Sequence, residues 1–126
     1  MMLDKKSTKP IYMQVADWIE SEILSGHFKP DERVYSQYQL AEMYTINPAT
    51  AAKGLNLLAD EDILYKKRGL GMFVSEGAKE AIRKKRKTGT LGRLAREVVL
   101  EARRLKVSEE QLLTMIRDIY KEECER

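Results

Sequence analysis

The chain has 126 residues, 34% of them charged and 43% hydrophobic, which is an ordinary composition for a globular protein. This length fits one compact domain, or a small domain with an appendage. A single cysteine, Cys124, excludes an intrachain disulfide framework and fits a reducing compartment. No apolar run is long enough to span a bilayer, and the polar N-terminal segment does not resemble a signal peptide. We therefore expect a cytoplasmic protein without a membrane partner.

The net charge of +3 is unevenly distributed along the chain. The segment from Lys66 to Lys87 carries nine Lys and Arg and two Glu, a net charge of +7, so the remaining residues carry −4. A local positive field on a nearly balanced protein suggests a polyanionic partner at one face. For the basic run Arg83–Lys87 two interpretations stay open: a solvated linker helix, or a helix that also contacts DNA phosphates.

Nothing in the sequence indicates an enzyme. His27 is the only histidine, and with no second histidine and no cysteine nearby it cannot anchor a metal site. Cys124 is isolated near the C-terminus, and no glycine loop of the phosphate-cradling kind is present. We expect no catalytic residues, no metal and no cofactor.

The first predicted helix begins at Pro10 and ends before Gly26, a typical C-terminal stop. Its apolar residues repeat at four-residue steps, so they form one stripe: Ile11, Val15, Ile19 and Ile23. Ser36 is the cap of a second, short helix, Thr45-Ile46 makes a turn, and Asn47 caps a third helix. Two helices joined by a tight turn predict a helix-turn-helix.

The helix from Asn47 to Asp60 is the centre of this prediction. Pro48 suits the first helical position because its missing N–H costs nothing there. One face is apolar and the other carries short or polar side chains: Ala51, Leu55 and Leu58 against Thr50, Lys53 and Asn56. On its own the pattern favours an ordinary amphipathic core helix. Its surroundings favour a helix that enters the DNA major groove by its N-terminal turns.

Two strand-like runs, residues 63–67 and 72–75, follow around a glycine-containing loop and predict a β-hairpin. A basic hairpin after a helix-turn-helix is typical of a winged helix. Gly69 and Gly71 permit positive φ and hence a slim tip, which can lie along a phosphate backbone or a minor groove.

The C-terminal part is predicted to be helical. Residues 77–87 favour a helix, and Thr88 to Gly92 predict a break or kink. A helix follows from Leu91, and Ser108 with Gln111 forms a capping box that opens another. This hairpin of about thirty residues has too little core to stand alone. It would pack on the winged domain or, as we favour, on a copy of itself in a four-helix dimer core. The residues expected at that interface are Leu91, Leu94, Val98, Leu105, Leu112, Ile116 and Ile119.

The predicted fold class is thus mainly α with a small β-hairpin: a winged helix-turn-helix followed by a two-helix C-terminal dimerisation hairpin. We expect a DNA-binding domain at 9–76 and a helical linker with dimerisation hairpin at 77–126.

Five segments between Lys9 and Ser75 carry a resemblance to a known family. Two of them are Ile23-Leu24-Ser25-Gly26 with Lys29-Pro30, and Ser36 with Leu40-Ala41. Residues 10–16, Pro-Ile-Tyr-Met-Gln-Val-Ala, resemble the opening helix of the GntR family of bacterial transcription regulators, and residues 68–74 resemble its wing. Asn47-Pro48-Ala49-Thr50 with Lys53 resembles the recognition helix of the YtrA subfamily. The resemblance implies a homodimeric repressor that binds an inverted-repeat operator in double-stranded DNA. The residues it places at DNA are Ser36, Thr50, Lys53, Arg68, Gly69 and Gly71. We expect their neighbours to contact DNA as well: Gln37, Tyr38, Asn47, Ala49 and Lys67.

The helix-turn-helix of this sequence has fewer basic residues than the family pattern. Tyr38, Pro48 and Ala52 stand where arginine is common, and between Ser36 and Asp60 only Lys53 is positive. Phosphate attraction must therefore come mainly from the wing and the run after it. The alternative interpretation is a winged-helix protein-interaction module without specific DNA binding.

A small-molecule effector is compatible with the sequence but is not identified by it. Four aromatic residues are candidates to line a small pocket: Trp18, Tyr35, Tyr38 and Tyr44. For Trp18, packing in the core is the favoured use.

Overall fold

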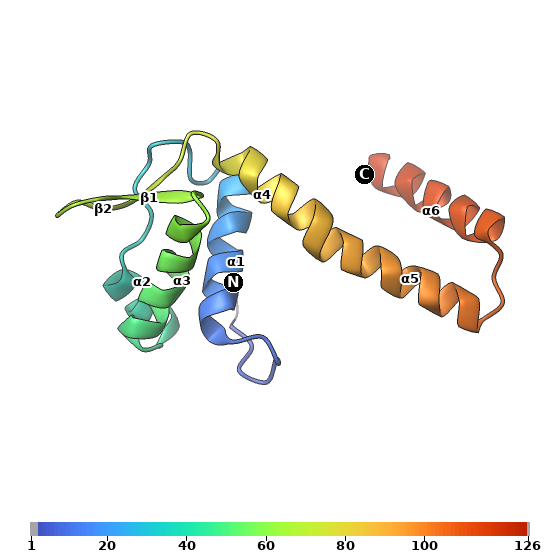
Figure 1. Cartoon of the computed structure of the whole chain (residues 1–126), viewed down its shortest axis with the longest axis horizontal. Coiled ribbons are helices and arrows are strands. Elements are labelled where there is room, and N and C mark those ends of the chain that lie inside the picture. The colour runs from blue at the N-terminus through green and yellow to red at the C-terminus, as the bar shows by residue number, and fades with distance from the viewer. Residues whose placement is uncertain (1–2, 126) are drawn as a thin grey trace. The chain divides into compact units, whose positions relative to one another are not determined.

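The computed structural model describes residues 3–125 and divides into two compact units between Lys84 and Lys85 (Figure 1). The first unit holds α1 (Ile11–Leu24), α2 (Gln37–Tyr44), α3 (Pro48–Asp60), β1 (Leu64–Lys67), β2 (Gly71–Val74) and the start of α4 (Ala78–Arg86). The second holds the π-helical turn η1 (Lys87–Leu91), α5 (Gly92–Arg104) and α6 (Glu109–Cys124). The predicted fold class, a winged helix-turn-helix followed by C-terminal helices, is confirmed. No helix within residues 3–125 combines the length and apolarity needed to cross a bilayer.

The core of the first unit lies between α1 and α3, which pack directly on each other. Val15, Ile19 and Ile23, three of the four residues of the predicted stripe on α1, are fully buried. They meet the predicted apolar face of α3, which buries Ala51, Leu55 and Leu58. The core therefore fixes which face of α3 points outward.

Local side-chain bonds set the ends of the helix-turn-helix. The Ser36 hydroxyl accepts a bond from the Gln39 backbone N–H, and the Gln39 side chain accepts one from the Ser36 N–H, which makes a capping box. Asn47 Oδ1 accepts from the Ala49 N–H at 2.8 Å, so the predicted cap of α3 is confirmed. Between them Thr45 adopts φ +53°, and this left-handed residue ends α2 where many such turns use glycine.

The wing is an antiparallel pair in which Leu64 faces Val74 and Lys67 faces Gly71. Both strands start one residue away from the prediction. A third segment, residues 31–34, bonds to β2 through Asp31 N–H to Val74 O, at 2.8 Å, and Val34 N–H to Met72 O, at 2.9 Å. The sequence pattern did not predict this segment, because its pairing is long-range and its residues have no strand periodicity.

The second unit is a helical hairpin with very little interior. Of the break or kink predicted near Thr88–Gly92, a break is absent: the chain stays helical there, and the hydrogen-bond period changes to that of a π-helical turn. The predicted capping box of Ser108 and Gln111 is confirmed. Ala102, 8% exposed, is the only buried side chain among the described residues of this unit.

Aromatic rings pack beside the core of the first unit. Trp18 stacks on Tyr35 with centroids 6.0 Å apart and meets the edge of Tyr44 at 5.5 Å. Trp18 and Tyr44 are half-buried against the core cluster, in line with core packing as the favoured use of Trp18. Tyr38 stands apart from these ring contacts and is 69% exposed.

The close approach of α1 and α3 at Gly54 gives a test of this packing. A Cβ on Gly54 would lie 2.7 Å from the backbone oxygen of Tyr12 and 3.2 Å from Val15 Cγ1. We expect Gly54→Ala to lower the free energy of unfolding by about 1–3 kcal/mol, because the helices must separate. The roughly 1 kcal/mol by which alanine favours a helix over glycine acts in the opposite direction and is already included in this net loss. Urea denaturation of the purified protein measures it.

The matched control is Gly77→Ala in the same unit, where an added Cβ meets no atom within 4 Å. Its unfolding midpoint should stay near that of the wild type. Equal midpoints for Gly54→Ala and the wild type would show that the close approach does not constrain the fold.

Candidate nucleic-acid interface

The outward face of α3 carries the residues predicted to read DNA. Lys53 and Asn56 are exposed and Thr50 is half-buried, opposite the face that enters the core. A concave surface of about 520 Å³ runs along this face. Its lining comes from the starts of α1 and α2 and from α3: Tyr12, Gln37, Ala49, Ala52, Lys53, Asn56, Leu57 and Asp60.

Lys53, the only basic residue on this face of α3, contacts an aromatic ring. The Lys53 ammonium lies 4.1 Å from the ring centroid of Tyr12, a cation–π arrangement. Tyr12 belongs to α1 and is half-buried. Sequence reasoning missed it as a site residue, because nothing local links position 12 to position 53.

The start of α2 lies next to this surface. The Ser36 hydroxyl oxygen is engaged in the capping box, while its O–H remains a donor. Gln37 lines the concave surface, whereas Tyr38 is exposed outside it. Asn47 is exposed, but its side-chain oxygen serves as the cap of α3.

A second hollow, of about 210 Å³, joins the helix-turn-helix to the wing. It is lined by Ser36, Gln37 and Asn56 on one side and by Lys66 and Gly71 on the other. Arg33 also lines it.

The Arg33 side chain passes close to Gly71, with its Nε 3.0 Å from where a Cβ on that glycine would lie. Arg33 and Lys66 thus supply cations beside a helix-turn-helix that is poor in them. No local pattern points to Arg33, since it reaches the site only through the pairing of residues 31–34 with β2.

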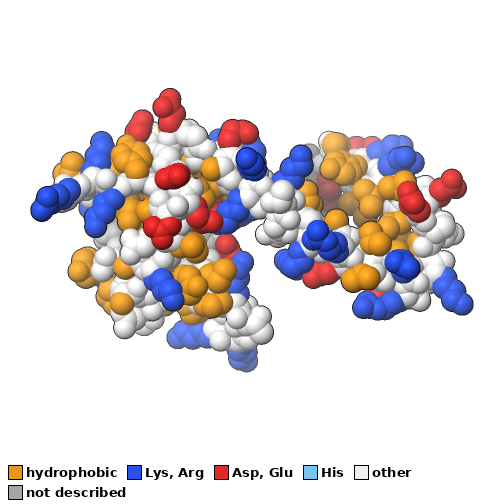
Figure 2. Space-filling view, in the orientation of Figure 1, with side chains coloured by type: hydrophobic (Ala, Val, Ile, Leu, Met, Phe, Trp, Pro, Cys, Tyr) orange, Lys and Arg blue, Asp and Glu red, His pale blue; other side chains and the backbone are white. Residues whose placement is uncertain are grey.

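The tip of the wing is cationic and tightly turned. Lys67, Arg68 and Leu70 are exposed, and Figure 2 shows Lys and Arg side chains at the tip of the β1–β2 hairpin of Figure 1. Gly69 and Gly71 have φ of +77° and +109°, as their predicted role in a slim tip requires. The Lys67 ammonium lies 4.6 Å from the ring centroid of Phe73.

A side-chain hydrogen bond also joins the wing to the first residue of the segment 31–34. The Tyr65 hydroxyl donates a 2.7 Å hydrogen bond to Asp31 Oδ1. This bond raises the pKa of Tyr65 above its usual range, because only the protonated phenol can donate. Asp31 itself has φ +66°, the left-handed conformation that aspartate tolerates better than most residues.

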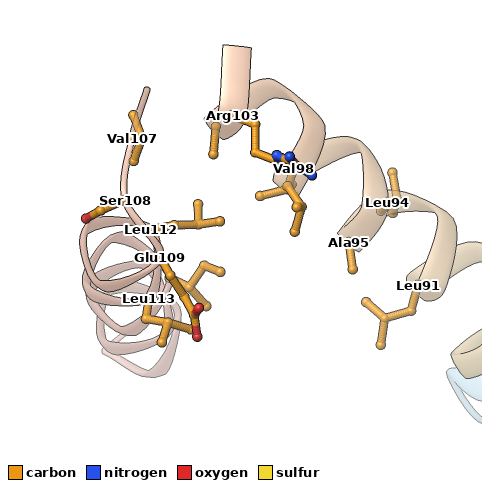
Figure 3. Close-up of a pocket in the computed structure, with 13 residues that line it drawn as sticks. Leu91, Leu94, Ala95, Val98, Arg103, Val107, Ser108, Glu109, Leu112 and Leu113 are labelled. Carbon is orange, nitrogen blue, oxygen red and sulfur yellow. The ribbon is translucent and has the colours of Figure 1, made fainter. Parts of the chain in front are cut away.

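The residues predicted for dimerisation lie on the second unit. A cavity of about 730 Å³ opens between α5 and α6, and Leu91 and Ala95 lie on its α5 side while Leu112 points in from α6 (Figure 3). Five of the seven predicted residues line it: Leu91, Leu94, Val98, Leu112 and Ile116. Leu105 lines a neighbouring hollow of about 350 Å³, and Ile119 is half exposed at 50%.

Within residues 3–125 no three or more His, Cys, Asp or Glu side chains are grouped as a metal site. The ring of His27 contacts the Glu22 carboxylate, at the end of α1. What the first unit offers is a helix face with a few donors and acceptors, flanked by a basic hairpin.

Residues 11–74, about half of the chain, match the family model described as bacterial regulatory proteins, gntR family. This chain belongs to the gntR family of bacterial regulatory proteins. It is therefore a helix-turn-helix regulator of transcription that binds DNA, and not an enzyme.

Two curated relatives show how far the likeness extends. The HTH-type transcriptional repressor YtrA of Bacillus subtilis (strain 168) is 29% identical over 119 residues, which are 94% of this chain and 91% of YtrA. The HTH-type transcriptional repressor NagR of the same organism is 34% identical over 76 residues, 60% of this chain but 31% of NagR. The chain thus spans about a third of NagR and most of YtrA, which confirms the YtrA-like resemblance.

Solved structures agree with this placement. A GntR family transcriptional regulator from Listeria monocytogenes, 25% identical, superimposes with a TM-score of 0.72 over 90% of this chain and 97% of its own. The AraR DNA-binding domain, solved in complex with operator ORE1, is 29% identical, with a TM-score of 0.53 over 58% of this chain and 89% of its own.

Proposed function

We propose that this protein is a homodimeric repressor that blocks transcription by occupying an inverted-repeat operator. The observation that carries the proposal is the outward face of α3 with Thr50, Lys53 and Asn56. Asn56 of this face lines one hollow together with Lys66 of the cationic wing. The similar AraR domain was solved in complex with an operator, which supports operator DNA as the ligand of this unit. Such a regulator would act in the cytoplasm.

In this proposal each protomer places α3 in a major groove. Two copies would enter successive grooves roughly 34 Å apart on one side of the duplex. Lys53 and Thr50 would read base edges, and Ser36 and Tyr38 would hold phosphates. The wing would lie on backbone or minor groove through Lys67 and Arg68, with Gly69 and Gly71 keeping its tip thin.

The dimer would form through the second unit. Its apolar side chains stay exposed in a single chain, and a hairpin this small cannot bury them within itself. Figure 2 shows many of them gathered on the hairpin face in view. A second copy would cover them in a four-helix core. We propose residues 9–76 as the DNA-binding domain and 77–126 as the linker and dimerisation hairpin, with Ala78 and Ile82 of α4 packing into the core of the winged unit.

Selection of bound sites from random duplex DNA by the full chain tests the proposal as a whole. We expect a recovered site with two inverted half-sites about one helical turn apart, bound more tightly at low salt. The absence of any salt-dependent binding would overturn the proposal. It would favour the protein-interaction winged helix that the scarcity of cations between Ser36 and Asp60 suggests.

Separate roles for α3 and the wing give a second test. Lys53→Ala should weaken operator binding by about 1–3 kcal/mol and relax the base preference at one position of each half-site, because alanine cannot donate a hydrogen bond to a base edge. Fluorescence anisotropy on the selected operator and on single-base variants of it measures both effects.

The matched change neutralises the wing cations, as Lys66→Gln, Lys67→Gln and Arg68→Gln together. This variant should weaken all sequences alike and reduce the slope of log affinity against log salt by about one for each phosphate that is no longer neutralised. If Lys53→Ala bound operator and single-base variants as the wild type does, Lys53 would not take part in readout.

The dimer is tested by placing charge in the apolar cavity of the hairpin. Leu94→Asp with Val98→Asp should yield a monomer in sedimentation equilibrium, where the wild type is a dimer, because two carboxylates would be buried without partners. The control, Arg96→Asp with Leu100→Asp, adds two carboxylates at the same spacing on α5 and should remain dimeric. A wild-type chain that stays monomeric at all concentrations would contradict the proposed dimer.

A further inference from the structure

Tyr12 stands at the start of α1, on the edge of the concave surface along α3, and core packing alone does not account for its place. Its ring is half-buried and lines that surface together with Lys53 and Gln37. The Lys53 ammonium lies over the ring, 4.1 Å from its centroid. At this distance the negative face of the ring attracts the cation.

The backbone fixes where this ring lies. Gly54 follows Lys53 on α3, and a Cβ on it would be 2.7 Å from the backbone oxygen of Tyr12. The close approach of α1 and α3 is therefore made by the two residues that carry or adjoin the cation–π pair. The ring is set beside Lys53 by helix packing rather than by a flexible arm.

We propose that Tyr12 is a positioning residue for DNA recognition, which holds the Lys53 side chain extended along the outward face of α3. A lysine side chain has a flexible four-carbon stem and loses much rotamer freedom when it is fixed on a ligand. Holding it on a ring before binding reduces that cost. The ammonium has three N–H donors, so the side turned away from the ring can still donate to a base or a phosphate.

This role matters more here than in a helix-turn-helix rich in arginine. Lys53 is the only Lys or Arg between Ser36 and Asp60. A single cation that sampled many rotamers would contribute little to readout. The inference rests on the proposed role of Lys53 in DNA binding.

The experiment uses the full chain and two variants of Tyr12. Tyr12→Phe keeps the ring and removes the hydroxyl, whereas Tyr12→Leu keeps apolar bulk and removes the π face. We expect operator affinity close to wild type for Tyr12→Phe and about two- to five-fold weaker for Tyr12→Leu, the range of an exposed cation–π interaction. Affinity is measured on the selected operator and on a scrambled duplex.

A double-mutant cycle with Lys53→Met separates positioning from general packing. Once the ammonium is gone, Tyr12→Leu should cause little further loss of operator affinity. An equal loss in both backgrounds would overturn the proposal, because the ring would then act independently of Lys53. Tighter binding by Tyr12→Leu would also overturn it and would show that the ring withholds the lysine from DNA. A loss in Tyr12→Phe as large as that in Tyr12→Leu would overturn it in favour of a hydrogen bond by the hydroxyl.

NMR of the free protein detects the contact between Lys53 and the Tyr12 ring without DNA. In NMR spectra of the free protein, the Lys53 ε-protons should be shifted upfield by the ring in the wild type and Tyr12→Phe, and should return to ordinary values in Tyr12→Leu. Unshifted ε-protons in the wild type would overturn the inference. If instead the wild type bound no DNA while the upfield shift was present, the proposed function and not the cation–π pair would have failed.

Phe73→Leu is the matched control on the wing, where Phe73 lies under the Lys67 ammonium at 4.6 Å. Because Lys67 would meet phosphates, this change should weaken operator and scrambled duplex by the same factor. A selective loss on the operator in Tyr12→Leu, but not in Phe73→Leu, supports a positioning role in base readout. Parallel losses in both variants on both duplexes would overturn it.

Discussion

The packing of α1 against α3 at Gly54 is the constraint on which the rest of the first unit depends. A residue without a side chain lets the α3 backbone come against the carbonyl of Tyr12, so the two helices share one buried interface. Once Ala51, Leu55 and Leu58 face that interface, the helical period leaves Thr50, Lys53 and Asn56 outside. The face proposed to read DNA is thus defined by what the core excludes, and the same packing brings an aromatic ring under the only lysine of that face.

Much of this could be predicted from the sequence, and the reason is that the signals are local. Ser36, Asn47 and Ser108 cap their helices through atoms two or three residues away, so a short window contains the whole interaction. The apolar face of α3 follows from spacing alone. The positive φ values of Gly69 and Gly71 follow from a turn too tight for other residues.

The parts that sequence reasoning missed all depend on interactions between residues distant along the chain. Arg33 reaches Gly71 only because residues 31–34 pair with β2, and Tyr12 reaches Lys53 only because α1 crosses α3. Neither contact can be predicted from the residues next to it in the sequence. Near Thr88–Gly92, where a break or kink is predicted, the chain does not break: glycine and threonine weaken a helix, but propensities this small yield to a change of hydrogen-bond period that keeps the backbone bonded.

The second unit differs from the first in how much apolar surface it buries within one chain. The winged unit buries a continuous core within one chain, whereas in the hairpin only Ala102 is buried among the described residues and leucines and valines remain exposed. If a second copy covers these side chains, association supplies stability that the hairpin lacks alone, and that stability depends on protein concentration. An operator with two half-sites would bind the assembled pair more tightly than either chain. DNA and the hairpin interface would then stabilise each other, since a ligand that favours the dimer shifts the equilibrium toward it by its differential affinity.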